Sequence, residues 1–195
     1  MTRVMDDIHD WCRGKSWLAR LPVWLYLLYV GVKQYQNPEF WSLFSAINLC
    51  IHEGGHILLR PFGDVPHVAG GTIAQLAAPI AAMVILGKQR DYFGIAFGLG
   101  WLSTNLVGVG YYMADARAQA LPLVTAEGGG GETIHDWNYL FGHFGLLPYD
   151  EIIGLDVRGA AAAVMIAALA GGAWLMLEMA WPTNRATAPS GTTRE

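Results

Sequence analysis

The sequence predicts an all-α, polytopic helical membrane protein with about four to five transmembrane helices and one long ordered loop. Three observations predict this class. Of the 195 residues, 53% are hydrophobic and only 14% are charged, whereas about 25% are charged in a typical soluble domain. Apolar stretches recur along the chain at lengths near the roughly 20 residues that a helix needs to cross a bilayer. A backbone inside lipid must satisfy its own hydrogen bonds, so stretches of this length indicate helices.

The expected elements follow one another from the N-terminus. Residues 1–16 carry Asp6, Asp7 and Asp10 and predict an interfacial segment rather than a removable signal peptide. The apolar stretches comprise residues 17–32, 41–59, 68–87, 92–113 and 155–181. The first stretch is short and the third contains Gly70, Gly71 and Pro79, so either one is a candidate interfacial or re-entrant segment. The expectation is therefore four to five crossings.

The long loop of this expectation spans residues 114–158, where polar and titratable residues replace the apolar pattern. Its aromatic residues argue for an ordered loop, which could cover a site as a lid. Residues 17–181 then make up the helical membrane domain, and residues 182–195 are expected to be a disordered tail. The expected location is a cell (inner) membrane, into which the protein is integrated.

Charge and cysteine content exclude several classes of protein. The net charge is −4 and no cluster of Lys or Arg interleaves with aromatics, so a nucleic-acid partner is not expected. Cys12 and Cys50 are too few for a disulfide framework or a Cys-rich zinc site. Metal ligands would therefore be histidines or carboxylates. Small residues at 160–163 and 171–173 suit close helix packing, within one chain or between chains, which leaves the oligomeric state open.

The strongest motif is His52-Glu53-Gly54-Gly55-His56. Residues four apart lie on one face of a helix, so both imidazoles can reach one metal ion while Glu53 lies beside them as a base. Histidine and glutamate side chains are unfavourable inside a membrane and mark a functional site by default. The motif predicts a Zn²⁺ site with His52 and His56 as ligands and Glu53 as the catalytic base. In the alternative interpretation, two buried histidines hydrogen-bond to neighbouring helices and Glu53 has no role.

A catalytic zinc site takes three protein ligands and one water, so the chain must supply a third ligand. Asp115, at the end of the fourth stretch, and His135, in the loop, are competing candidates. Asp115 could fold back onto the metal, or it could be a solvated residue that pairs with Arg117. His135 followed by Asp136 is typical of a ligand and the carboxylate that supports it. Adjacent residues rarely point the same way, so one of these two is a more plausible neighbour of the metal than both.

At these motifs the chain resembles the site-2-protease family of intramembrane zinc metalloproteases, over residues 41–117. The helix with His52, Glu53 and His56 looks like the family's first metal helix. Residues 78–82 are similar to the family's Gly-Pro element, with alanines in place of its Gly and Asn. The segment from Asn105 to Asp115 looks like the family's Asn-to-Asp segment, and the resemblance therefore implies that Asp115 is the third zinc ligand.

The function predicted is zinc-dependent hydrolysis of a peptide bond in or near the membrane, with the bilayer and a membrane protein or peptide as partners. Zinc would activate a water whose proton Glu53 takes. Asn48 and Asn105 could orient the substrate, although interhelical hydrogen bonding explains both residues at least as well. The alternatives are a zinc hydrolase of a lipid or small amide, a non-catalytic metal-binding membrane protein, and a structural helical bundle.

Overall fold

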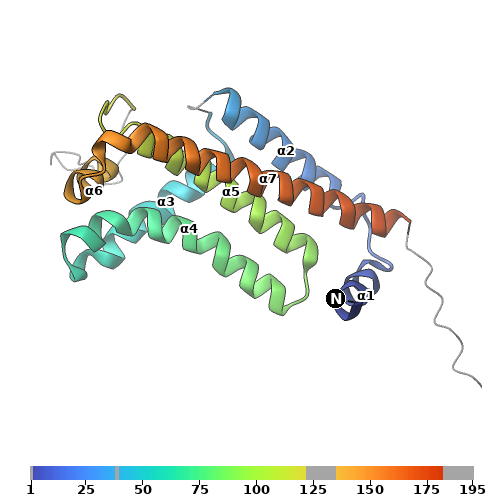
Figure 1. The fold of residues 1–195 in the computed structure, drawn as a ribbon. Helices are drawn as coiled ribbons and strands as arrows, with labels where there is room; N and C mark the ends of the chain where they lie inside the picture. Colours follow the sequence, from blue (N-terminus) through green and yellow to red (C-terminus); the bar gives the residue numbers. More distant parts are fainter. Residues whose placement is uncertain (1, 38–39, 122–134, 182–195) are drawn as a thin grey trace, which may run out of the picture.

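A computed structural model describes residues 2–37, 40–121 and 135–181 of the chain, and this part is helical without strands. The chain runs through seven α-helices and two short 3₁₀ helices, which Figure 1 shows in order. The helices are α1 (Thr2–Cys12), α2 (Leu21–Gln36), α3 (Leu43–Leu59), α4 (Asp64–Lys88), α5 (Tyr92–Ala114), α6 (Asp136–Phe144) and α7 (Asp150–Ala180), with 3₁₀ turns η1 (Arg60–Phe62) and η2 (Leu147–Tyr149). The all-α class predicted from the sequence is confirmed for the described residues.

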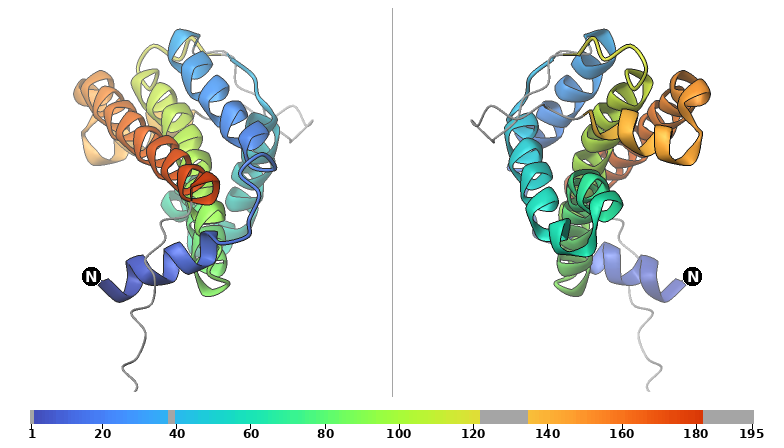
Figure 2. Two further views of the ribbon diagram at one scale, coloured as in Figure 1. Left: turned by 90° about the vertical axis from the view of Figure 1, so that its right-hand side faces the viewer. Right: turned by 90° about the vertical axis from the view of Figure 1, so that its left-hand side faces the viewer.

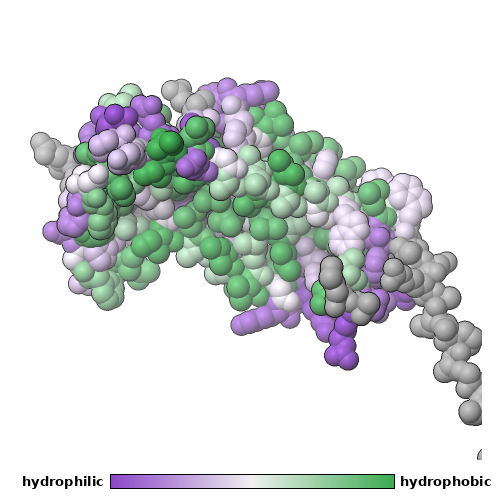
Figure 3. All heavy atoms as spheres, in the orientation of Figure 1, coloured by the Kyte–Doolittle hydropathy of each residue, from purple (hydrophilic) through white to green (hydrophobic). Residues whose placement is uncertain are grey.

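Three helical segments are long and apolar enough to cross a membrane: α4, α5, and α7 together with the turn that precedes it. The helices α2 and α3 have 16 and 17 residues, which is below the roughly 20 that a perpendicular crossing needs. Large apolar side chains face outward on the long helices, as Ile73 and Val84 do on α4 and Ile166 does on α7. On the face shown in Figure 3, hydrophobic surface covers the middle of the molecule, and hydrophilic residues gather at its two ends.

The helix α5 lies at the centre of the bundle, with α7 on one side and α2 and α3 on the other (Figure 2). Small residues allow α5 and α7 to approach closely. A Cβ on Gly154 of α7 would lie 2.4 Å from the carbonyl oxygen of Gly110 of α5, so a side chain at this position cannot be accommodated without a shift. Such contacts between small residues drive helix association in membranes, where burial of apolar surface gives little advantage.

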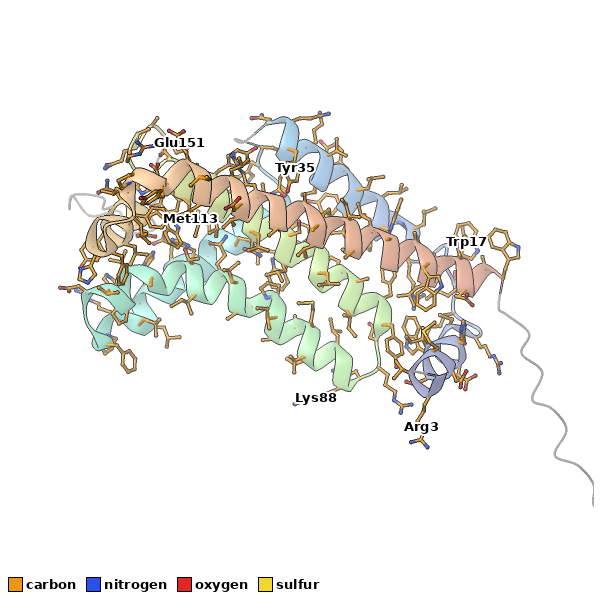
Figure 4. The ribbon with its side chains drawn as sticks, in the orientation of Figure 1. Arg3, Trp17, Tyr35, Lys88, Met113 and Glu151 are labelled. Atoms are coloured by element: carbon orange, nitrogen blue, oxygen red, sulfur yellow. The ribbon has the colours of Figure 1, made fainter. Side chains whose placement is uncertain are left out.

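The helix α1 packs against the end of the bundle that lies far from α6. Asp7 forms an ion pair with Arg90 at 2.7 Å and also accepts a hydrogen bond from Tyr92. His9 lies 2.9 Å from Glu178 near the end of α7. Figure 4 places Arg3 and Lys88 toward this end and Met113 and Glu151 toward the α6 end. The predicted N-terminal segment is thus a short helix with polar anchors.

The predicted long loop at residues 114–158 is corrected by the structure. Its described residues contain the whole of α6 and η2, and α7 begins at Asp150 rather than at residue 155. Charged residues in the first turns of α7 hide its start in the sequence, because they interrupt the apolar pattern. Asp150 is 1% exposed and accepts hydrogen bonds from the backbone N–H and the guanidinium of Arg117. Residues 122–134 of the loop and the predicted tail at residues 182–195 lie outside the described residues.

Candidate metal centre

The two motif histidines lie on the side of α3 that packs against α4. The capping box formed by Ser42 and Ser45 starts α3, and the helix continues through the motif without a break. Gly55 of α3 meets Gly70 of α4 backbone to backbone. A Cβ on Gly55 would lie 2.2 Å from the Gly70 carbonyl oxygen, and a Cβ on Gly70 would lie 2.4 Å from that of Gly55. Glycine at both positions therefore allows α3 and α4 to touch where the histidines emerge.

Gly71 provides the space that the two imidazoles occupy. A Cβ at this position would lie 2.5 Å from Nε2 of His52 and 2.6 Å from Nε2 of His56. Both Nε2 atoms therefore converge on the same glycine of α4. The absence of a side chain at Gly71 thus leaves room for both ring nitrogens against α4.

Each imidazole is oriented through its Nδ1 atom. His56 Nδ1 lies 2.9 Å from the carbonyl oxygen of His67, and His67 Nδ1 lies 2.9 Å from the carbonyl oxygen of His56. His52 Nδ1 lies 3.0 Å from Oε1 of Gln75. Because a carbonyl oxygen only accepts, Nδ1 of His56 carries its proton, and the Gln75 amide oxygen places the proton of His52 on the same atom. In neutral rings Nε2 then carries a lone pair, which is the arrangement that metal-binding histidines need.

Asp136 brings the third group to this position from the first residue of α6. Its Oδ2 lies 3.0 Å from Nε2 of His52 and 3.3 Å from Nε2 of His56. The backbone N–H of Asp136 donates to the hydroxyl of Tyr112 at 3.0 Å, which fixes the start of α6 against α5. Burial raises the pKa of the Asp136 carboxyl, but His52 and His56 in their protonated forms donate to it from Nε2, and these hydrogen bonds outweigh burial and hold the pKa below its ordinary value. Asp136 is therefore ionised at neutral pH.

The geometry of these three side chains fits a metal ion. Their ligand atoms all lie within 4.8 Å of one another, and the group is the one of this kind among the described residues. Two Nε2 lone pairs and a carboxylate oxygen face one another with no donor between them when both rings are neutral, and a cation satisfies all three. Ligands at about 2.0–2.1 Å from a tetrahedral zinc lie about 3.3 Å apart, close to the 3.0 and 3.3 Å found here. His₂-carboxylate sets with a free position are typical of catalytic zinc.

Glu53 lies next to this group. It follows His52 on α3, about 100° around the helix axis, and its side chain is partly exposed. Its carboxylate interacts electrostatically with the His56 imidazole and with the Tyr112 hydroxyl. Glu53 therefore lies close enough to this group to act on it electrostatically, and it is not one of the three groups that converge.

The two predicted competitors for the third ligand, Asp115 and His135, are placed elsewhere by the structure. They face each other, with His135 Nε2 3.4 Å from Asp115 Oδ2. The two carboxylate oxygens of Asp115 accept the backbone N–H groups of Ala120 and Leu121. His135 is the N-cap of α6 and its Nδ1 accepts the N–H of Asn138. Neither residue reaches the motif histidines, and Asp136, predicted as the supporting carboxylate, does.

The two asparagines singled out in the sequence lie inside the bundle. Asn48 accepts a hydrogen bond from the indole N–H of Trp101 at 2.7 Å, which joins α3 to α5. Asn105 is fully buried and donates to the carbonyl oxygen of Trp101, one turn earlier on α5. Asn48 thus forms the interhelical hydrogen bond of its simpler interpretation, whereas the hydrogen bond of Asn105 stays within α5.

Several residues of the site were not predicted from the sequence. His67, Gly71 and Gln75 line the side of α4 that faces the motif, at successive steps of four residues. Such a spacing places residues on one helix face, so it was a usable signal. In the sequence, the glycines of this stretch were expected to interrupt a membrane crossing, so this spacing was not used. The helix α4 in fact runs unbroken through Gly70, Gly71 and Pro79.

Replacement of Gly71 by alanine is expected to weaken metal binding about 10-fold or more. The new methyl group must displace both Nε2 atoms, and perturbing the support of metal ligands typically changes affinity by about 10–100-fold. Competition with a fluorescent zinc chelator on the detergent-purified protein measures the change. The matched control is Gly54→Ala, because a Cβ there meets nothing within 4 Å. Equal affinities of the two variants would show that the metal does not lie over Gly71.

Comparison of the chain with models of protein families, with characterised proteins and with solved structures finds no match in any of the three. The likeness to site-2 proteases therefore rests on the sequence motifs alone. The functional proposal is based on the geometry of the site.

Proposed function

We propose that the chain is a membrane-embedded zinc-dependent hydrolase that cleaves peptide bonds in or near the membrane. The observation that carries this proposal is the convergence of His52 Nε2, His56 Nε2 and Asp136 Oδ2. Glu53 follows His52 on the same helix and acts electrostatically on His56. Three ligands leave a fourth position for water or substrate, which separates a catalytic from a closed structural zinc site. The resemblance of the HEGGH helix to the site-2-protease family supports the same activity.

When bound, zinc would supply Lewis acidity, which lowers the pKa of a water and polarises a carbonyl group. Glu53 takes a proton from the attacking water, and the water oxygen forms a bond to the carbonyl carbon. The bond from that carbon to nitrogen then breaks, and Glu53 passes the proton to the leaving amine. The products are a carboxylic acid and an amine, so one water is consumed per bond and Glu53 is regenerated.

The location of the site bears on the substrate. The motif faces a part of α4 about two to three turns from the start of that helix, and Tyr112 and Asp136 are near helix ends. We therefore propose that cleavage takes place toward one end of the bundle, near the surface of a cell membrane such as the inner membrane. We also propose that α2 and α3 are tilted or partial membrane crossings, which brings the number of transmembrane helices to four to five.

The experiment that tests this proposal is a hydrolysis assay of the purified, zinc-loaded protein in lipid vesicles. The substrates are a panel of fluorogenic membrane-anchored peptides and, in parallel, acyl-amide and acyl-ester lipids. The proposal expects peptide cleavage that a chelator abolishes and added zinc restores. Zinc-dependent cleavage of the lipids alone would replace the peptidase assignment with a lipid hydrolase. Stoichiometric zinc without any turnover would favour a metal-binding protein that is not an enzyme.

A further inference from the structure

Tyr112 of α5 has a hydroxyl group with an unused hydrogen-bond donor beside the three candidate ligands. Its oxygen accepts the backbone N–H of Asp136 at 3.0 Å. A phenol has one O–H donor as well as acceptor lone pairs, so accepting this bond leaves its proton free. No side chain or carbonyl of the described residues accepts that proton. The hydroxyl is thus anchored through its oxygen and still able to donate.

The ring of Tyr112 lies near two histidine rings. It packs against the His135 ring, with ring centroids 4.2 Å apart, and lies near the His52 ring, with centroids 6.5 Å apart. His135 is itself fixed as the N-cap of α6. A donor that is fixed before the substrate arrives needs no reorganisation during the reaction, which is the property that makes oxyanion-stabilising groups effective.

The charged groups around Tyr112 determine which kind of substrate group its hydroxyl can bind. The carboxylates of Asp136, Glu53 and Asp115 all act electrostatically on its hydroxyl. With an ordinary phenol pKa of about 10, the group carries its proton at neutral pH and is the neutral donor among these anions. Its hydroxyl can therefore donate to a substrate oxygen that gains negative charge at the metal.

We propose that Tyr112 is a catalytic residue that donates a hydrogen bond to the carbonyl oxygen of the substrate as that oxygen becomes negatively charged. This inference rests on the proposed function, because it assigns a role in the same reaction. The proton stays on Tyr112 throughout, so no bond to it is made or broken. The role differs from merely positioning Asp136, which would use only the hydroxyl oxygen.

The test is ligand binding by the full chain loaded with cobalt(II), whose visible absorption reports on groups that bind it. Acetohydroxamate is the probe, because its oxygens mimic a charged carbonyl oxygen at a metal. Tyr112→Phe is expected to keep cobalt affinity within about three-fold and to weaken acetohydroxamate binding about 10-fold or more, the range for a hydrogen bond to a charged group. Tyr111→Phe is the matched control, because its ring packs under Arg158 at 4.4 Å instead, and it should bind both as the wild type does.

Two results would overturn the inference. If Tyr112→Phe loses cobalt affinity while acetohydroxamate binds the loaded variant as tightly as the loaded wild type, Tyr112 only positions Asp136. If the wild type itself binds no cobalt, the proposed function falls and the role of Tyr112 falls with it. In the assay with a cleavable peptide, the same variant should lower kcat with little change in KM, because the bond strengthens only as charge develops.

Discussion

Asp136→Asn is expected to lower zinc affinity more than about 100-fold, because it removes the anionic group that we propose as the third ligand and leaves the shape of the side chain almost unchanged. Loss of a group that only supports a ligand typically reduces affinity by about 10–100-fold, so loss of a ligand itself should exceed this range. The start of α6 should survive, because its anchors are the His135 cap and the bond from the Asp136 N–H to Tyr112. Affinity is measured by competition with a zinc chelator of known strength.

Asp115→Asn is the matched control for this prediction. Asp115 is also a buried carboxylate near the start of α6, but its oxygens accept the N–H groups of Ala120 and Leu121 and face His135. The variant should therefore lose stability through weaker hydrogen bonds and keep its zinc affinity. If Asp115→Asn loses zinc and Asp136→Asn keeps it, the third ligand is the one that the family resemblance implies, and the arrangement described here is overturned.

Glu53→Gln is expected to bind zinc as tightly as the wild type and to lose about 10²–10⁴-fold in turnover, the usual contribution of a general base. Glutamine has the same shape but cannot take a proton from water. Turnover is measured on whichever peptide the wild type cleaves, with zinc content determined on the same samples. Glu151→Gln serves as the control, because Glu151 is exposed and pairs with Arg117 away from the site. A Glu53→Gln protein with undiminished turnover would show that another group activates the water.

The helices and the juxtaposition of the two motif histidines could be predicted from the sequence because both depend on local patterns. Apolar stretches near bilayer length gave the positions of α4 and α5 to within a few residues. The i, i+4 spacing of His52 and His56 requires only that the motif be helical, and α3 is helical through the motif.

The third group could not be chosen in the same way. Asp136 lies 84 residues from His52 in the sequence, so its approach depends on how α6 packs. At the start of a helix, the N-cap residue turns its side chain toward the backbone N–H groups of the first turn, and the next residue points elsewhere. His135 takes the cap position here and Asp136 is left to face α3. The adjacent pair was singled out in the sequence, and the structure brings Asp136 rather than His135 to the two motif histidines.

The site's support on α4 escaped prediction for a different reason. Glycines in an apolar stretch read as weak points of a helix because glycine disfavours helix interiors. Gly70 and Gly71 instead allow contact with Gly55 and provide space for the two imidazoles. Only the position of the neighbouring helix distinguishes a glycine that breaks a helix from one that makes room for a partner.

The central claim is that the side chains of His52, His56 and Asp136 hold one metal ion, and elemental analysis of the detergent-purified wild-type chain tests it most directly. The protein is purified without added metal, then again after incubation with zinc and removal of the excess, and His56→Ala is treated in parallel. We expect about one zinc per wild-type chain and none in the variant. A wild-type chain that holds no metal after incubation with zinc, or a His56→Ala chain that holds as much as the wild type, would contradict it.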